Sequence, residues 1–213
     1  MSTETPISQS KGPRRRGDDT RRRVEEAAAR LFTERGYSAT SMQAIADAAG
    51  VHVQTIYLAY RTKAAVLAAS AARLVAGDED PATHPSRRTW ARTIQAAPGA
   101  RDKIALYVRH IVDVAPRITP LIDVLRATAP SEPDVAAFLE HMEHARREGP
   151  LQLLGPLASS GQLRDTLTPD DVADIVFALA SPDTIRALTV RCGWDSDRAA
   201  AWLTAALIHE LLS

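Results

Sequence analysis

Residues 41–63 read SMQAIADAAGVHVQTIYLAYRTK and contain two short apolar-periodic segments on either side of Ala49-Gly50-Val51-His52. Isolated helices of about two turns are unstable in water, so neighbouring structure must hold both of them. Gly50 stands where a helix would end in a left-handed conformation, which glycine adopts without steric cost. The pattern therefore predicts two short helices joined by a tight turn, as in a helix-turn-helix, with the second helix running from about Val53 to Tyr60.

The apolar spacing also predicts which side of each short helix is buried. The buried stripe of the first helix comprises Met42, Ile45, Ala46 and Ala49, and that of the second comprises Ile56 with Ala59 or Tyr60. Thr40-Ser41-Met42-Gln43 matches a capping box at the start of the first helix. The remaining residues of the second helix would then face outward.

Basic residues crowd into KGPRRRGDDTRRR, residues 11–23, just before the next apolar pattern. Pro13 and Gly17 should break any helix before about residue 18, so residues 1–17 are expected to form a disordered basic arm. The following helix has one apolar face and ends at Gly36; the residues of that face are Val24, Ala27, Ala28, Leu31 and Phe32.

The formal net charge of zero hides an uneven distribution. Residues 1–63 carry 11 Lys and Arg against 7 Asp and Glu, whereas residues 64–213 carry 15 against 19. A basic head on an acidic body indicates that the head meets a polyanion, although such a modest excess also fits an ordinary solvated surface. The sole cysteine, Cys192, excludes an intrachain disulfide. With no apolar run near ~18 residues and no secretory signal, a soluble, cytoplasmic protein with no membrane partner is expected.

From RRRVEEAAARLFTERGYSATSMQAIADAAGVHVQTIYLAYRTKAAVLAA, the chain resembles the DNA-binding domain of the TetR family of transcriptional regulators. The resemblance runs without a gap to about residue 70, and its marks are AxxLFxxxGYxxTS, IAxxAGV and TIYxxYxxK. It implies DNA-backbone contacts at Thr55, Tyr57 and Lys63. The sequence departs from the family at Ala59, where a histidine or another polar residue often stands.

Side-chain chemistry suggests how the outward face would bind DNA. Gln54 can bind adenine through two hydrogen bonds, Thr55 can contact a thymine methyl or a phosphate, and Tyr57 suits a phosphate at the groove wall. Gln43 either reaches a base or only closes the capping box, and Val53 either touches a thymine methyl or packs inside. Arg14, Arg15 and Arg16 form either a minor-groove arm or a solvated tail. The full candidate set is Arg14, Arg15, Arg16, Thr40, Ser41, Gln43, His52, Val53, Gln54, Thr55, Tyr57, Tyr60 and Lys63.

The fold class is expected to be all-α, with a three-helix DNA-binding domain at residues 18–63 and a second helical domain at 64–213 for effector binding and dimerisation. Helical patterns after the head occupy about 63–75, 87–96, 101–115, 118–128, 133–160, 169–192 and 195–212. Breaks are expected at Pro98-Gly99 and Pro116, and kinks at Pro150, Pro156 and Pro182.

The segments 172–180 and 202–212 are apolar nearly all round. Such helices pack on both their own domain and a partner, or else form an internal core. TetR-like proteins dimerise through their last two long helices, so the resemblance favours a homodimer that reads a palindromic double-stranded operator. The candidate interface residues are Val172, Ile175, Val176, Leu179, Trp202, Leu203, Ala206 and Leu207.

The resemblance also implies a small-molecule effector of unknown identity. Candidate lining residues combine apolar bodies with a few polar groups, although ordinary core or surface is the first explanation for each: Trp90, Tyr107, His110, Leu125, Phe138, His141 and Met142. An inducer would act by favouring a conformation whose two heads are wrongly spaced on DNA.

An enzyme is not expected. EHMEHARRE, residues 140–148, places Glu140, His144 and Glu148 one helical turn apart, but no Glu-x-x-His pair or second ligand cluster supports a metal site. Cys192 has no evident base beside it, and no cofactor motif is present. The resemblance thus implies a ligand-responsive, DNA-binding repressor. The alternative is a helical homodimer that binds a small molecule or protein without specific DNA recognition.

Overall fold

The computed structural model describes residues 13–77, 79–154 and 161–212, with side chains from Gly17 onward. The chain divides into two compact units, one ending at Ser70 and the other beginning at Ala71. The boundary lies inside a helix, seven residues after the predicted boundary between 63 and 64, because the helix that leaves the head also completes its core.

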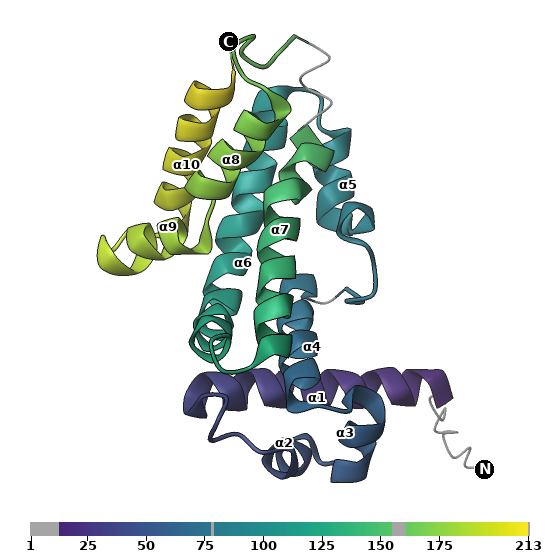
Figure 1. The fold of residues 1–213 in the computed structure, drawn as a ribbon. Helices are drawn as coiled ribbons and strands as arrows, with labels where there is room; N and C mark the ends of the chain where they lie inside the picture. Colours follow the sequence, from purple (N-terminus) through teal and green to yellow (C-terminus); the bar gives the residue numbers. More distant parts are fainter. Residues whose placement is uncertain (1–12, 78, 155–160, 213) are drawn as a thin grey trace, which may run out of the picture. The chain divides into compact units, whose positions relative to one another are not determined.

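The N-terminal unit contains α1 (Pro13–Arg35), α2 (Met42–Ala49), α3 (Val53–Tyr60) and the first half of α4 (Lys63–Ala76). The long α1 crosses both short helices, and α2 packs against α1 and α3 (Figure 1). Helix α1 begins at Pro13, so the prediction of a non-helical chain through residue 17 is wrong for residues 13–17. Proline is favoured at the first position of a helix, and a single exposed glycine costs a long helix only about 1 kcal/mol.

Aliphatic and aromatic side chains from all four helices form the core of this unit. Phe32 and Tyr37 stack with ring centroids 5.7 Å apart at the joint between α1 and α2. The fully or nearly fully buried members are Val24, Ala28, Leu31, Phe32, Ile45, Ala46, Ile56, Val66 and Leu67. This core explains how two helices of eight residues each remain folded.

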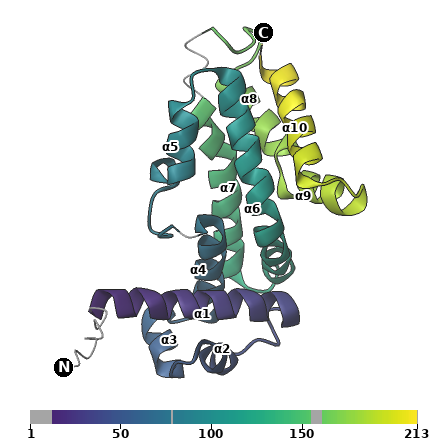
Figure 2. The same cartoon turned by 180° about the vertical axis from the view of Figure 1, so that it is seen from behind.

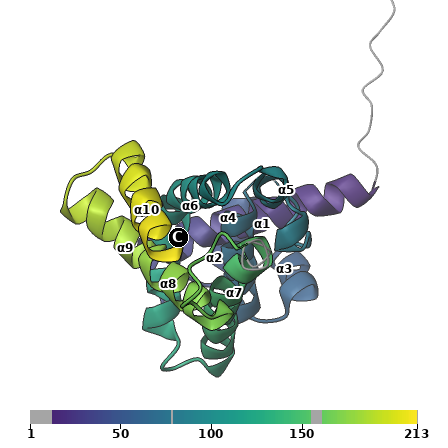
Figure 3. The same cartoon turned by 90° about the horizontal axis from the view of Figure 1, so that it is seen from above.

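The second unit contains a short 3₁₀ turn η1 (Pro85–Arg87), α5 (Thr89–Ala96), α6 (Ala100–Thr128), α7 (Pro133–Leu154), α8 (Pro169–Leu179), α9 (Pro182–Arg186), a π-helical turn η3 (Ala187–Arg191) and α10 (Ser196–Leu211). Helix α6 is central and contacts α5, α7, α9 and α10. Figure 2 shows α5 and α10 on opposite sides of α6, and Figure 3 shows the same separation from above.

Helix α6 continues through Pro116 and Pro120, so the predicted break at Pro116 is wrong. Both prolines are exposed, whereas Val112, Ala115 and Ile118 beside them are buried. Hydrophobic packing along one face holds the helix together, and the interruptions in its hydrogen bonding fall on the solvent side.

The predicted helix 169–192 is instead two helices and a π turn. Helix α8 ends at Leu179, and Pro182 begins α9 rather than kinking a longer helix. The side chain of Ser181 caps the new helix by accepting from the Thr184 N–H at 3.0 Å. Pro150 lies inside the continuous α7, while the kink predicted at Pro156 lies outside the described residues.

The core of the second unit joins α5, α6, α7, α8 and α10 through buried side chains such as Ile104, Val108, Val176, Leu203 and Leu207. In the described part of the chain, β-structure is limited to an isolated bridge between Leu163 and Leu212. None of the described helices combines the length and apolarity needed to cross a membrane. The all-α prediction is confirmed.

Candidate nucleic-acid interface

Helix α2 is defined by a side-chain cap at one end and a glycine at the other. The Ser41 hydroxyl accepts from the Ala44 N–H at 3.1 Å. Gly50 has φ 63° and ψ 45°, and its N–H bonds back to the last turn of the helix. The capping box predicted from Thr40 to Gln43 is wrong, because the cap is Ser41 and Gln43 then lies one residue too early to complete a box. Gln43 instead donates to Asp47 Oδ1 at 2.8 Å. Gln43 therefore lies exposed on the outer side of α2.

Helix α3 has one fully buried side chain, and most of its remaining surface faces outward. Ile56 is buried with 0% exposure, and Val53 is half-buried. Tyr57 is 50% exposed and Leu58 85% exposed. The other outward residues are His52, Gln54, Thr55 and Ala59. Four of the predicted contact residues, His52, Gln54, Thr55 and Tyr57, thus share one exposed surface around a helix.

Three other predicted contact residues have their polar groups bound within the domain. Thr40 is only 1% exposed and donates to the carbonyl oxygens of Leu31 and Gly36. The Tyr60 hydroxyl donates to Glu25 Oε1 at 3.0 Å. Burial removes Thr40 from the candidate contacts, which corrects the prediction from the sequence. Tyr60 is half-buried and bound to Glu25 of α1 whereas Ala59 is exposed, so Tyr60 is the residue that points inward.

Lys63 is also held inside the N-terminal unit. Its Nζ donates to the Tyr37 carbonyl at 2.9 Å and lies 4.1 Å from the centroid of the Tyr37 ring. A carbonyl and an aromatic face together satisfy much of an ammonium group. In this arrangement Lys63 fastens the start of α4 to the α1–α2 joint, a role different from the predicted phosphate contact.

Arg61, which the sequence analysis missed, lies between α3 and α4. It is exposed and has φ 63° and ψ −47°, a positive φ in a residue that is not glycine. The Thr62 N–H bonds to the Tyr60 carbonyl at 2.7 Å across it, which makes a γ-turn, a strained three-residue turn. The sequence signal for Arg61 was its position, because it is the first basic residue after the exposed helix. Strain of this kind is concentrated at functional sites.

A groove of about 310 Å³ separates α3 from α1. Its walls are Gly17, Thr20, Arg21, Val24, Thr55, Ile56, Ala59 and Tyr60. Ala59 is exposed and too small to cover the groove, which is the structural consequence of the departure from the family pattern. The backbone of Arg14, Arg15 and Arg16 forms part of the first turn of α1. Their side chains are outside the part of the chain that the structure describes.

Among the predicted effector residues, Trp90 and His110 come together. Their rings stack with centroids 4.0 Å apart and an interplanar angle of 10°. Burial, followed by the charge of Arg117, lowers the pKa of His110 to about 4. The imidazole is therefore neutral at physiological pH.

Tyr107 lies elsewhere on α6, buried, and burial raises its pKa to about 12. Near it, Arg146 of α7 lies 3.5 Å from the centroid of the Phe177 ring and donates to the Phe177 carbonyl at 2.8 Å. Leu125 is fully buried, Phe138 and Met142 are half-buried, and His141 is exposed. Of the seven predicted residues, Trp90 and His110 are the pair in direct ring contact.

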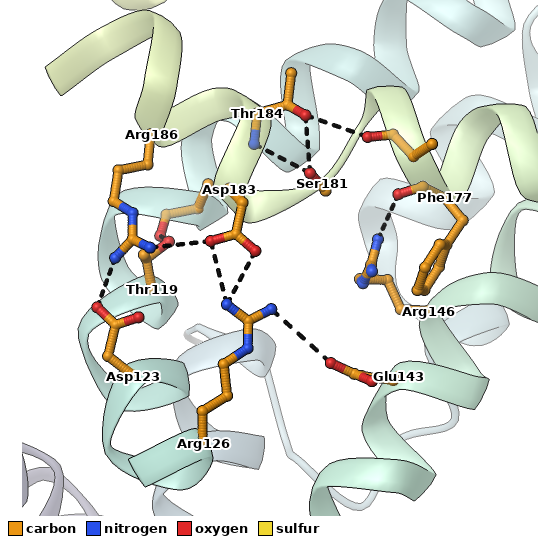
Figure 4. A network of polar contacts seen from close by, with 12 residues as sticks. Thr119, Asp123, Arg126, Glu143, Arg146, Phe177, Ser181, Asp183, Thr184 and Arg186 are labelled. Carbon is orange, nitrogen blue, oxygen red and sulfur yellow. Dashed lines mark hydrogen bonds and ion pairs between the residues drawn. The ribbon is translucent and has the colours of Figure 1, made fainter. Parts of the chain in front are cut away.

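Figure 4 shows a network of ion pairs beside this region. Asp183, in the first turn of α9, binds Arg126 of α6 at 2.9 Å and Arg186 at 3.0 Å. Arg186 also binds Asp123 of α6 at 2.6 Å, and Arg126 approaches Glu143 of α7 at 3.8 Å. The network therefore connects α6, α7 and α9 on a partly exposed surface.

Half of the predicted dimer residues are internal. Val172, Val176, Leu203 and Leu207 are at most 1% exposed in the core of their own domain, so for them the alternative of an internal core is correct. Ile175 and Leu179 are half-buried against the same core. Trp202 is 44% exposed and Ala206 half-buried. The outward side of α10 instead carries Arg198, Ala201, Trp202, Ala205 and His209.

No group of three His, Cys, Asp or Glu side chains within the described ranges is arranged to hold a metal ion. His144 pairs with Glu148 at 3.2 Å on the exposed surface of α7. Cys192 is exposed.

Residues 26–70 match the family described as "Bacterial regulatory proteins, tetR family". No curated protein matches the chain.

Solved structures with the same fold include a TetR-family transcriptional regulator from Rhodococcus sp. (18% identity, TM-score 0.72, 92% of this chain and 100% of that one). A second is a transcriptional regulator from Saccharomonospora viridis in complex with choline (19% identity, TM-score 0.67, 92% of this chain and 99% of that one). A third is NalD from Pseudomonas aeruginosa, the secondary repressor of a multidrug efflux pump (19% identity, TM-score 0.68, 92% of this chain and 98% of that one). At these identities the likeness establishes the fold.

The fold and the exposed helix define a helix-turn-helix DNA-binding protein with a second helical domain. The family match over residues 26–70 confirms the resemblance found in the sequence: this part of the chain is similar to the DNA-binding domain of TetR-family transcriptional regulators, and the whole chain shares their fold.

Proposed function

We propose that this regulator is a homodimeric repressor that binds a palindromic operator through α3 and leaves it when a small molecule binds the helical domain. The observation that carries the proposal is the surface of α3, in which Ile56 anchors the helix while His52, Gln54, Thr55 and Tyr57 remain exposed. An exposed helix held at a fixed angle by its domain can enter a major groove and place amide and hydroxyl groups at base edges.

Backbone contacts are assigned by exposure. Tyr57 offers a hydroxyl on a rigid, half-exposed ring, and Ser41 and Gln43 lie at the outward start of α2. Arg61 replaces Lys63 as the main cation at the end of α3, because Arg61 is exposed whereas Lys63 is bound to Tyr37. Arg14, Arg15 and Arg16 are proposed to add a salt-sensitive contact in the minor groove. A regulator of this kind works in the cytoplasm, where operator DNA lies.

Dimerisation is proposed to use the outward side of α10. Residues 198, 201, 202, 205 and 209 follow the i, i+3, i+4, i+7, i+11 spacing of one helix face, and all five are exposed. The small residues Ala201 and Ala205 allow close approach, and Trp202 supplies an aromatic anchor. The outward side of α8 is less suited, because it carries Asp170 and Asp174, both paired with Arg147.

Ligand release is supported by the neighbours that share the fold, one of which is a complex with choline and another a repressor of an efflux pump. An effector acts by binding one conformation of the dimer more tightly than the other. The competing function is a helical dimer that binds a ligand or protein without specific DNA recognition, and only the Ala59 departure favours it.

The experiment is a selection from random duplexes with the purified full-length protein, followed by anisotropy titration of the selected duplex. A palindromic winner bound at least a hundredfold more tightly than scrambled DNA is expected. Tyr57→Ala should abolish this binding while circular dichroism and oligomeric state stay unchanged.

Tyr57→Phe is the matched control, since it keeps the ring and removes only the hydroxyl. If the hydroxyl contacts a phosphate, this variant loses about tenfold, or roughly 1–1.5 kcal/mol, similarly for all sequences. Selection of no sequence, with weak and steeply salt-dependent binding, would instead support the dimer without specific recognition.

A further inference from the structure

The exposed side of α3 carries a large apolar side chain. Leu58 is 85% exposed, the highest value among the exposed large apolar side chains in the part of the chain that the structure describes, and Val190 follows with 73%. A single exposed leucine is ordinary on a protein surface, so its exposure alone indicates no function. The position of Leu58 around the helix is the observation that points to one.

The position of each residue around α3 follows from its separation from Ile56, which is buried with 0% exposure. At 3.6 residues per turn, two residues correspond to about 200° around the helix axis. Gln54 precedes Ile56 by two residues and Leu58 follows it by two, so both lie on the side opposite the core, one helical turn apart. Thr55 and Tyr57 adjoin Ile56 in the sequence and therefore lie on the two flanks. In a major groove, the centre of this face lies nearest the bases, and its flanks lie nearest the backbone walls.

The chemistry of leucine selects what the centre of this face can contact. Base edges in the major groove present hydrogen-bond donors, acceptors and one apolar group, the C5-methyl of thymine. The Leu58 side chain neither donates nor accepts, so packing it on a polar edge would remove water from that edge without replacing its hydrogen bonds. Packing it on a thymine methyl instead removes apolar surface from water on both partners. Thymine is therefore the base that Leu58 favours.

We infer that Leu58 is a specificity-determining residue that contacts the C5-methyl of a thymine in each half-site of the operator. The inference rests on the proposed function and adds to it a base contact made by an apolar side chain. Four residues along a helix rise by about 6 Å, and successive base pairs are about 3.4 Å apart. The thymine should therefore lie within about two base pairs of the adenine that Gln54 is proposed to bind.

The test uses the full-length protein and the duplex that the random selection yields. Each thymine of the half-site is replaced in turn, in both half-sites at once, by deoxyuridine, which removes only the 5-methyl group and keeps the base pairing. Anisotropy titration at constant salt gives the Kd of each duplex. At one position the wild type should lose roughly tenfold in affinity, because burying one methyl group is worth about fourfold and two half-sites are changed.

Leu58→Ala removes most of the contact, so its affinities for the thymine and deoxyuridine duplexes should agree within twofold at that position. Leu58→Met keeps an apolar side chain of similar volume and should retain most of the discrimination. The matched control is Val190→Ala, which shortens an exposed apolar side chain outside the N-terminal unit and should leave every Kd within twofold. Circular dichroism should be the same for all these proteins, since both substituted side chains are exposed.

Thr55 is the competing explanation, because a threonine methyl can also contact thymine. Thr55→Ser removes only that methyl, and the ratio of the two affinities is the readout whatever happens to their absolute values. Loss of the discrimination in Thr55→Ser, together with its persistence in Leu58→Ala, would assign the contact to Thr55 and overturn the inference.

The inference and the proposed function fail in different ways. A selected palindrome that contains no thymine, or one whose affinity is unchanged by deoxyuridine at every position, supports the proposed function and overturns the role of Leu58. The same holds if Leu58→Ala discriminates as strongly as the wild type. If the selection yields no sequence at all, the proposed function itself fails, and the role of Leu58 fails with it.

Discussion

Arg61 has a strained backbone conformation, which lowers the stability of the folded protein. Its φ of 63° and ψ of −47° place an L-residue in a region that glycine tolerates far better. The Thr62–Tyr60 hydrogen bond closes the γ-turn and turns the chain from α3 into α4. Retaining arginine there is explained if its charge is used at the end of the recognition helix.

Replacing Arg61 with glycine should therefore separate stability from binding. Relief of the strained backbone is expected to raise the free energy of unfolding by about 1 kcal/mol, while loss of the cation weakens DNA binding and reduces the salt dependence by about one counter-ion. Urea denaturation and anisotropy at two salt concentrations measure the two effects. Arg61→Lys retains both strain and charge, and weakened binding there as severe as in the glycine variant would argue against a simple electrostatic contact.

His110 predicts a pH dependence of stability in the helical domain. Its folded pKa of about 4 lies below the ordinary 6.5, so between these values the unfolded chain binds a proton that the folded chain does not. The contribution of His110 is complete above about pH 6.5, falls as the pH drops towards 4, and amounts to about 3 kcal/mol at most.

The groups that set this pKa are Arg117 and Arg88, which lower it, and Asp113 and Glu79, which raise it. His110→Phe retains an aromatic ring against Trp90 and removes the titration. Urea midpoints of both proteins from pH 7 to 4 should diverge as the pH falls, with the wild type losing more. Parallel curves would mean that His110 has the same pKa in the folded and unfolded chains.

At the residue scale, the sequence patterns predicted correctly which residues of α3 are exposed. They did not predict which polar side chains have hydrogen-bond partners within the protein. Gln54 and Tyr57 are exposed because the helical period around Ile56 requires it. Thr40, Tyr60 and Lys63 have the right chemistry for DNA, but each finds an internal partner: two carbonyls, Glu25 and Tyr37. The partners of Tyr60 and Lys63 lie 35 and 26 residues away in the sequence, so no local pattern indicates them.

At the scale of an element, α3 depends on one buried side chain. Ile56→Ala removes three carbon atoms from a site with 0% exposure and should lower the free energy of unfolding of the N-terminal unit by about 2–4 kcal/mol. Operator binding should fall with it, because an eight-residue helix is not stable by itself. Urea denaturation followed by circular dichroism measures the loss.

Leu58→Ala is the control for this change, since Leu58 is 85% exposed on the same helix. Its stability should change by less than about 0.5 kcal/mol. Equal destabilisation by the two substitutions would mean that α3 is not anchored through Ile56.

The ends of a helix could be predicted where local residues such as a cap or a glycine determine them. They could not be predicted where packing against other helices determines them. Gly50 and the Ser41 cap fix α2 locally, and the structure has that helix at Met42–Ala49. Pro116 is a strong local breaker, yet α6 passes through it because buried residues along its length hold it to four neighbouring helices. The break between α8 and α9 follows Ser181 and Pro182, a cap and first-turn pair that resembles a kink in sequence.

At the scale of the whole molecule, the sequence predicted a dimer but did not identify which side of α10 would form the interface. An apolar helix near the chain end predicts extra packing, yet sequence alone does not tell a side that faces the domain from one that faces a partner. The structure shows that Leu203 and Leu207 face the core, whereas Ala201, Trp202 and Ala205 are exposed. The proposed interface therefore lies on the other side of α10 from most of the predicted residues.

Ala205→Arg tests that surface without disturbing the protomer. Ala205 is exposed, so a long cation is accommodated in the monomer, but two copies of it across a two-fold axis repel each other and keep the helices apart. The variant should be monomeric in sedimentation or light scattering. Because two linked heads bind a palindrome far more tightly than one, its operator affinity should fall at least a hundredfold.

Ser196→Arg places the same side chain on the opposite side of α10, about two and a half turns before Ala205, and should remain dimeric with unchanged operator affinity. If Ala205→Arg is still a dimer, α10 does not form the interface, and the search moves to the half-buried edge of α8. If it is monomeric yet binds the operator as tightly as the wild type, then a single head suffices for recognition. In that case the palindrome would reflect two independent sites and not the symmetry of the protein.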